Sequence, residues 1–181
     1  MKINCIIDDV NISADIYTHM SLLDFIRQRK IGSEGLYCKC SDKKCMNCLC
    51  FMEDAFKLSG ARELLPSCLM PAYKANGKKV TTADYFLGFE EASDVFDAYE
   101  LLKLKPCHDC FASKTMILSY IIGEYLEYET RYGGIMDARF AEEKTRIIAS
   151  NMNLSSCFCL SMKNVSAIVD TGIKIRRNRV V

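Results

Sequence analysis

Hydrophobic and polar positions alternate along the first part of the chain. Residues 2–7 are rich in β-branched side chains, and residues 10–16 alternate apolar with polar side chains. Alternation with a period of two is typical of a β-strand with one buried face. Asp8 and Asp9, which lie between the two runs, are of a type that favours turns. The pattern therefore predicts a β-hairpin.

A short helix and further strands are predicted after the hairpin. Ser21 precedes the apolar run at residues 22–27 and has an acidic residue three positions after it, which is typical of a capped helix start. Residues 49–51 and 79–82 are strand candidates, and residues 64–70 form a segment between them. Together these elements predict a small mixed sheet packed on one helix.

After Thr82 the hydrophobic period changes to that of α-helices. Four segments have this period: residues 90–103, 113–128, 137–150 and 165–169. No strand pattern occurs among them, so the sequence predicts a separate helical domain and an α+β chain overall. We expect domains over residues 1–82 and 83–169, followed by a basic, solvated tail over residues 170–181.

The composition narrows the classes of function. Half of the 181 residues are hydrophobic, and 24 Lys and Arg nearly balance 23 Asp and Glu, so no basic field indicates nucleic-acid binding. The longest apolar tract, residues 116–126, is too short to cross a bilayer, and the first residues lack the pattern of a signal peptide. The chain has eleven cysteines, most of them clustered at metal-ligand spacings, which indicates metal sites in a reducing compartment. We therefore expect a cytoplasmic protein without a membrane or nucleic-acid partner.

Five of the eleven cysteines lie within one stretch of thirteen residues. Inside this stretch is Cys40-x4-Cys45-x2-Cys48, and Cys68 follows after nineteen intervening residues. Three thiolates on one loop and a fourth from a separate element match the plant-type ferredoxin spacing, which holds a [2Fe–2S] cluster. A zinc site is the alternative, because Cys45-x2-Cys48 alone fits a zinc knuckle.

Cys38 and Cys50 flank these four cysteines. A [2Fe–2S] cluster needs no further ligand, so we expect each of the two to be a buried apolar residue or a free thiol. The close spacing also allows Cys38 to replace Cys40 as a ligand.

A second group of cysteines lies in the helical half. Cys107-x2-Cys110 falls at the turn between the first two predicted helices, and Cys157-x-Cys159 falls between the third and fourth. In a four-helix bundle both turns can lie at the same end, which would bring four thiolates together around a second [2Fe–2S] cluster. The alternatives are a zinc site, a redox pair and unrelated buried cysteines.

The order of these eight cysteines resembles that of the iron–sulfur (small) subunit of the xanthine dehydrogenase/carbon monoxide dehydrogenase family of molybdenum hydroxylases. The resemblance covers about residues 2–169. It includes four local matches: residues 22–24, 67–69, 80–82 and 116–119.

The family implies a β-grasp ferredoxin-like domain followed by a four-helix bundle, with one [2Fe–2S] cluster in each. It implies eight metal ligands: Cys40, Cys45, Cys48, Cys68, Cys107, Cys110, Cys157 and Cys159. It also implies an electron-transfer role in a hetero-oligomeric oxidoreductase, without a catalytic residue in this chain. Single electrons would pass from a molybdopterin subunit to the C-terminal cluster, then to the N-terminal cluster, and then to an FAD subunit.

Two other functions stay open at this stage. Lys39, Ser41, Lys43 and Met46 stand where the family has glycines around its first cluster. These departures favour a zinc-binding structural or assembly subunit that has lost its redox role. The second alternative is a ferredoxin-like carrier that serves a flavin oxidoreductase without molybdenum.

Overall fold

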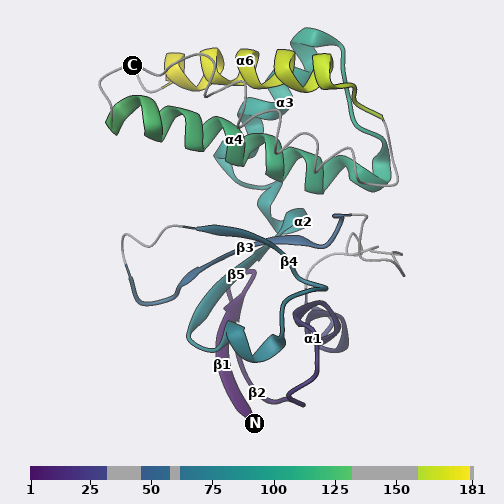
Figure 1. Ribbon diagram of the computed structural model, residues 1–181, viewed down its shortest axis with the longest axis vertical. Helices are drawn as coiled ribbons and strands as arrows, with labels where there is room; N and C mark the ends of the chain where they lie inside the picture. The colour runs from purple at the N-terminus through teal and green to yellow at the C-terminus, as the bar shows by residue number, and fades with distance from the viewer. Residues whose placement is uncertain (32–45, 58–61, 132–158, 180–181) are drawn as a thin grey trace. The chain divides into compact units, whose positions relative to one another are not determined.

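The computed structural model describes residues 1–31, 46–57, 62–131 and 159–179. The chain divides into two compact units, Met1–Phe86 and Leu87–Val181 (Figure 1). The described part of the first unit contains a five-stranded sheet and two α-helices, and the described part of the second is helical. The chain is therefore α+β, as predicted from the change of period after Thr82.

The sheet of the first unit is mixed. Its strands are β1 (Lys2–Ile7), β2 (Val10–Asp15), β3 (Leu49–Asp54), β4 (Glu63–Pro66) and β5 (Lys78–Thr82). They lie in the order β2-β1-β5-β3-β4, in which β1 and β5 run parallel and the other neighbours run antiparallel. The predicted hairpin is confirmed as β1 and β2, and the two strand candidates are confirmed as β3 and β5.

Helix α1 (Leu22–Gln28) begins as its sequence predicts. The Ser21 hydroxyl accepts a hydrogen bond from the backbone N–H of Asp24 at 3.1 Å, which satisfies one of the N–H groups that a helix start leaves unpaired. Phe25 and Ile26 are buried in the core of the first unit together with β1 and β5 side chains such as Val80. Each such side chain stabilises the fold by about 1.5–3 kcal/mol relative to full exposure.

The turn between β1 and β2 is tied to the end of β5. Asp8 and Asp9 have φ values of 48° and 63°, which suits a two-residue turn whose twist matches that of the strands. The buried Asp8 carboxylate accepts hydrogen bonds from the backbone N–H and the hydroxyl of Thr82, both at 2.8 Å. Asp9 pairs with Lys79 at 2.9 Å and accepts a hydrogen bond from the Tyr85 hydroxyl at 2.6 Å.

These two neighbouring carboxyl groups are expected to titrate in opposite directions. Burial raises the pKa of Asp8, and the hydrogen bonds from Thr82 offset only part of that rise. The Tyr85 hydroxyl and Lys79 lower the pKa of Asp9. Asp8 therefore favours folding most below the ordinary aspartate pKa and loses this contribution as pH rises through its raised value. Asp9 favours folding above the ordinary pKa and loses its contribution as pH falls through the lowered one.

Carboxyl ¹³C NMR titration measures both values in one sample. Asp8→Asn should remove the higher of the two transitions and leave that of Asp9 in place. A pKa for Asp8 at or below the ordinary aspartate value would contradict the prediction.

The first unit extends four residues past the expected boundary at Thr82. Helix α2 (Ala83–Phe86) follows β5 directly, and the Thr82 hydroxyl accepts from the backbone N–H of Tyr85 at 3.4 Å. The Phe86 ring packs edge-on against Phe51 of β3 with ring centroids 5.4 Å apart. This packing places α2 with the sheet and not with the helices that follow.

The described part of the second unit contains helices α3 (Glu90–Leu102), α4 (Phe111–Arg131) and α6 (Met162–Arg179), with the 3₁₀ turn η2 (His108–Cys110) before α4. The three helices pack against one another. The predicted helices over residues 90–103 and 113–128 are confirmed, and α4 extends further at both ends. The helix predicted over residues 137–150 lies outside the described residues.

The predicted basic tail is wrong for residues 170–179, because these residues continue α6. Val169 and Ile173 are buried, so an apolar face runs past the short helix predicted over residues 165–169. Gly172 lets α6 approach α4 closely: a Cβ at this position would lie 2.4 Å from Cδ1 of Ile122.

The basic residues of α6 bind a buried acid on α3. The Arg176 guanidinium donates to the Asp94 carboxylate, to the Glu91 carbonyl at 2.9 Å and to the Ser119 hydroxyl of α4 at 3.1 Å. The other Asp94 oxygen accepts no hydrogen bond within the described residues and is balanced by Arg179 in an ion pair at 2.9 Å. This cluster joins all three helices.

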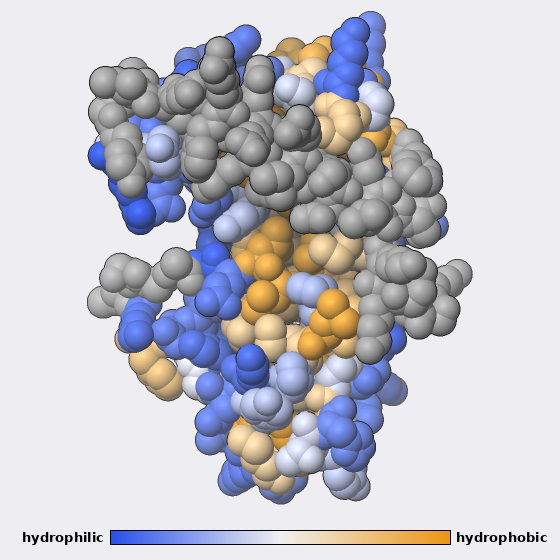
Figure 2. All heavy atoms as spheres, in the orientation of Figure 1, coloured by the Kyte–Doolittle hydropathy of each residue, from blue (hydrophilic) through white to orange (hydrophobic). Residues whose placement is uncertain are grey.

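Hydrophilic residues cover much of the visible surface, with hydrophobic residues gathered in patches between them (Figure 2). Among the described helices, none has both the length and the apolar character required to cross a membrane.

Candidate metal centres

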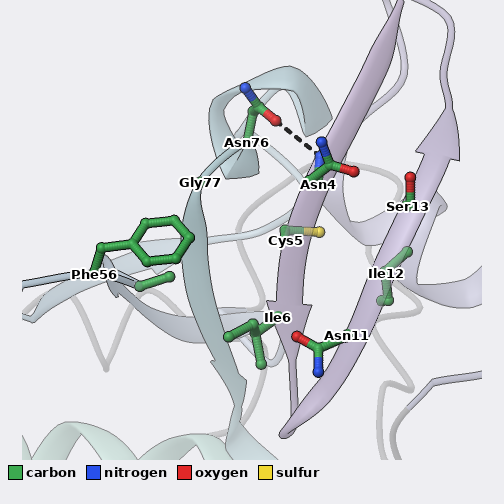
Figure 3. Close-up of a pocket in the computed structure, with 10 residues that line it drawn as sticks. Asn4, Cys5, Ile6, Asn11, Ile12, Ser13, Phe56, Asn76 and Gly77 are labelled. Carbon is green, nitrogen blue, oxygen red and sulfur yellow. Dashed lines mark hydrogen bonds between the residues drawn. The ribbon is translucent and has the colours of Figure 1, made fainter.

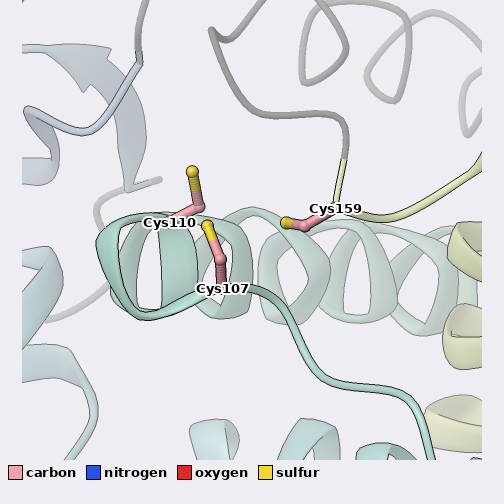
Figure 4. A group of neighbouring side chains, drawn as sticks. All are labelled: Cys107, Cys110 and Cys159. Atoms are coloured by element: carbon pink, nitrogen blue, oxygen red, sulfur yellow. The ribbon is translucent and has the colours of Figure 1, made fainter.

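Three cysteines of the second unit converge. Cys107, Cys110 and Cys159 have their sulfur atoms within 4.8 Å of one another (Figure 4). Cys107 immediately precedes the turn η2, Cys110 ends it, and Cys159 lies just before α6. Cys110 is buried and the other two are half-buried. The structure thus brings together three of the four ligands predicted for the second group, while Cys157 lies outside the described residues.

The local backbone explains why the first pair lies together. Helix α3 ends at Lys103, whose left-handed φ of 52° turns the chain, with the Lys103 N–H bonded to the Glu100 carbonyl at 3.1 Å. The chain then makes the 3₁₀ turn, in which the N–H of Cys110 donates to the carbonyl of Cys107 at 3.1 Å. Residues three apart in a 3₁₀ turn lie on the same side, so both sulfurs face the same region.

A lysine ammonium lies against this group. Lys114 of α4 is only 3% exposed, and its Nζ donates to Sγ of Cys159 at 3.1 Å. Burying an ammonium is costly unless an anionic group compensates it. A thiolate sulfur provides that charge, and thiolates are the form in which cysteines bind metals. The donor set and the buried cation therefore fit a metal centre with anionic sulfur ligands.

Aromatic side chains lie near the group. Burial, together with the nearby Cys159, raises the pKa of Tyr99, whose hydroxyl lies 3.3 Å from that of Thr115. Tyr99 is therefore a neutral phenol at any physiological pH and cannot serve as a base. Phe111 stacks on Phe96 with ring centroids 5.5 Å apart. Such surroundings lower the local dielectric constant and strengthen electrostatic interactions at the sulfurs.

The residues between Cys107 and Cys110 face solvent. The side chains of His108 and Asp109 are 99% and 86% exposed. Three soft sulfur donors suit both zinc and iron–sulfur chemistry.

The sheet register positions two cysteines of the first group. Strands β3 and β4 pair antiparallel with Leu49 opposite Pro66, so Cys48 precedes β3 at the end of the pair where Cys68 follows β4. Between them, Ser67 donates to the Cys48 carbonyl from its backbone N–H at 2.9 Å and from its hydroxyl at 2.7 Å. Cys48 is buried and Cys68 is half-buried. Cys40, Cys45 and the alternative ligand Cys38 lie outside the described residues.

Met46 adopts a conformation that usually requires glycine. Its φ is 56°, in the left-handed region that residues with a side chain rarely enter. Met46 is one of the positions at which the family that the cysteine order resembles has glycine. Its backbone adopts the conformation that glycine enters most readily.

Cys50 and Cys5 are buried thiols in the core of the first unit. Cys50 donates to the Leu65 carbonyl at 3.5 Å, and burial raises its pKa to about 12. Burial also raises the pKa of Cys5. Burial therefore favours the protonated thiol at both positions. The expectation that Cys50 is buried is confirmed, and its not being a ligand stays a prediction.

A hollow of about 490 Å³ lies beside β1 and β2, next to the exposed Phe56 and the Asn76-Gly77 turn (Figure 3). The Asn76 side chain accepts from the backbone N–H of Asn4 at 2.8 Å at its edge. Amides and aliphatic groups dominate the lining, and its one titratable group is the protonated thiol of Cys5. The hollow therefore offers no set of metal donors.

Lys114 was not singled out from the sequence. It interrupts an apolar helical stripe, and such a position is ordinarily read as the edge of a solvated face. The available signal was its spacing, because a residue four positions after Cys110 on a helix lies on the same face.

No protein-family model matches the sequence, and no curated protein matches it. Among solved structures, the chain is similar to a chain in the crystal structure of quinoline 2-oxidoreductase from Pseudomonas putida 86. The TM-score is 0.63 and the sequence identity 18%, over 99% of this chain and 96% of that one. This chain has the fold of that oxidoreductase chain. At the level of the fold, the likeness supports the resemblance that the cysteine order indicates.

Proposed function

We propose that this chain is the electron-transfer iron–sulfur subunit of a molybdenum-hydroxylase-like oxidoreductase. The observation that carries the proposal is the convergence of the Cys107, Cys110 and Cys159 sulfurs within 4.8 Å of one another, beside a buried lysine. In this proposal Cys157 is the fourth ligand there, and Cys40, Cys45, Cys48 and Cys68 hold the first cluster.

The finer architecture is part of the same proposal. The sheet order β2-β1-β5-β3-β4, with α1 in the core, suits a β-grasp ferredoxin-like domain. Three mutually packed helices suit a four-helix bundle, of which the helix predicted over residues 137–150 would be the fourth member. A fold shared with an oxidoreductase chain over nearly its whole length supports this arrangement.

Each [2Fe–2S] cluster, when bound, accepts and releases one electron without making or breaking a bond. The role of the chain is to hold the clusters, exclude water from them and set their potentials. Buried Cys48 and Cys110 restrict solvent access on one side of each site. In this proposal the chemistry on the substrate belongs to a cofactor of another subunit, and this chain carries electrons.

The partners follow from this role. Single electrons would arrive from a molybdopterin subunit and leave to an FAD subunit, in a hetero-oligomer located in the cytoplasm.

An anaerobic absorption spectrum before and after dithionite, with iron and zinc counted on the same sample, tests the proposal. We expect bands between roughly 400 and 550 nm that bleach on reduction, and about four irons per chain, as two binuclear clusters require. A colourless protein that carries zinc after iron-replete, anaerobic preparation would contradict it.

Two alternatives have distinct outcomes. The zinc-binding structural subunit predicts zinc at both sites and no bleaching. The second alternative is a ferredoxin-like carrier for a flavin oxidoreductase without molybdenum. It predicts two clusters and co-purification with a flavin subunit, and metal analysis of that complex should detect no molybdenum.

A further inference from the structure

We propose that Lys114 sets the reduction potential of the C-terminal [2Fe–2S] cluster through the hydrogen bond from its ammonium to Cys159 Sγ. This inference rests on the proposed function and concerns the same site. Lys114 acts through a ligand, so it is a positioning residue and not a catalytic one.

The burial of Lys114 distinguishes it from the other cations. Among the described residues it is the one lysine or arginine that is buried, and its ammonium lies 3.1 Å from a cysteine of the metal group. Lys105, nearby in sequence, is exposed and stacks over the Phe111 ring at 5.1 Å from its centroid. Water and salt screen the electrostatic interaction of an exposed charge strongly, and they screen that of a buried charge much less.

The direction of the effect follows from charge balance. On reduction one electron enters the site, no bond forms or breaks, and the cluster with its thiolates gains one negative charge. A fixed positive charge beside a ligand stabilises the more negative state. The N–H···S bond also withdraws charge from the sulfur. Both effects raise the potential of this cluster above that of the same site without Lys114.

A raised potential has a use at this position. The C-terminal cluster is proposed to receive electrons from the subunit that oxidises the substrate. Stabilising its reduced state makes that transfer more favourable. Lys114 would thus favour electron transfer from that subunit to the C-terminal cluster.

The test is a redox titration monitored by EPR on the iron-loaded chain and three variants. Lys114→Met removes the charge and the donor but keeps the side-chain length, and Lys114→Gln keeps a neutral donor. Lys163→Met is the matched control, because Lys163 is exposed and lies four residues after Cys159. It removes the same charge from a screened position.

We expect Lys114→Met to lower the one-electron reduction constant of one cluster at least tenfold, a shift of 59 mV, and to leave the other cluster unchanged. Lys114→Gln should produce a smaller shift in the same direction. Lys163→Met should change neither cluster by more than about twofold, since surface charges are weakly coupled to buried sites.

Unchanged potentials in Lys114 variants that keep both clusters would overturn the inference and leave the proposed function standing. An equal shift in Lys163→Met would also overturn it, because the effect would then be one of net charge. Loss of the cluster from both Lys114 variants would show that the lysine holds the site together instead of tuning it. A wild-type chain without iron at this group would overturn the proposed function as well.

Discussion

Asp94→Ala is expected to destabilise the helical unit by about 3–5 kcal/mol, the usual cost of breaking a buried ion pair by removing one partner. The Asp94 side chain is 4% exposed, and that of Arg176, which donates to it, is 16% exposed. Without Asp94, Arg176 keeps its bonds to the Glu91 carbonyl and the Ser119 hydroxyl but carries an uncompensated charge. The free energy of unfolding from urea titration measures the effect.

Asp97→Ala is the matched control on the same helix. Asp97 also pairs with Arg179, but its side chain is 47% exposed. An exposed pair contributes about 0–1 kcal/mol, so this variant should lose no more than that. Asp94→Asn separates charge from shape, because the amide fills the same space. Equal losses for Asp94→Ala and Asp97→Ala would contradict the idea that α6 is anchored by a buried ion pair.

Cys110→Ser is expected to reduce the iron content from about four to about two per chain. A serine hydroxyl is a hard, weakly acidic donor and replaces a soft thiolate poorly. Cys110 is 1% exposed at the centre of the second group, so water cannot readily take its place. Iron analysis and the intensity of the visible bands measure the loss.

Cys50→Ala provides the control. Cys50 is as buried as Cys110 and is adjacent to the first cysteine loop, but it is a protonated thiol. This variant should retain about four irons per chain. Its free energy of unfolding should fall slightly, because a buried sulfur atom is removed from the core. Retention of all iron by Cys110→Ser, or loss of half by Cys50→Ala, would contradict the ligand assignment.

The strand and helix predictions succeeded where local signals were strong. The hairpin could be predicted because alternation and two turn-forming aspartates agree, and the start of α1 because Ser21 caps it. The end of α6 could not be predicted, because a segment rich in arginine is typical of a solvent-exposed tail unless an acidic partner for it is known. The partner is Asp94, 82 residues away, and a contact at that separation leaves no local pattern.

The candidate sites divide in the same way. Spacing alone placed Cys107 with Cys110, since a turn of three residues brings them together. The approach of Cys159 depends on the docking of α6, so it was expected from the geometry of a four-helix bundle, in which both turns can lie at the same end, and not from spacing alone. The role of Lys114 could not be predicted from the residues next to it in the sequence, because its burial and its contact with Cys159 depend on the tertiary structure.

The position of Cys159 just before α6 makes completion of the second site depend on the docking of that helix. Cys107 and Cys110 are held together by their own turn. Cys159 arrives only when α6 docks on α3 and α4, a step that the Arg176–Asp94 pair secures near the opposite end of that helix. A cluster bound at this site would therefore show that the chain includes α6 and that α6 is docked on α3 and α4. A chain truncated within α6 would remain without its second cluster even though every cysteine is present.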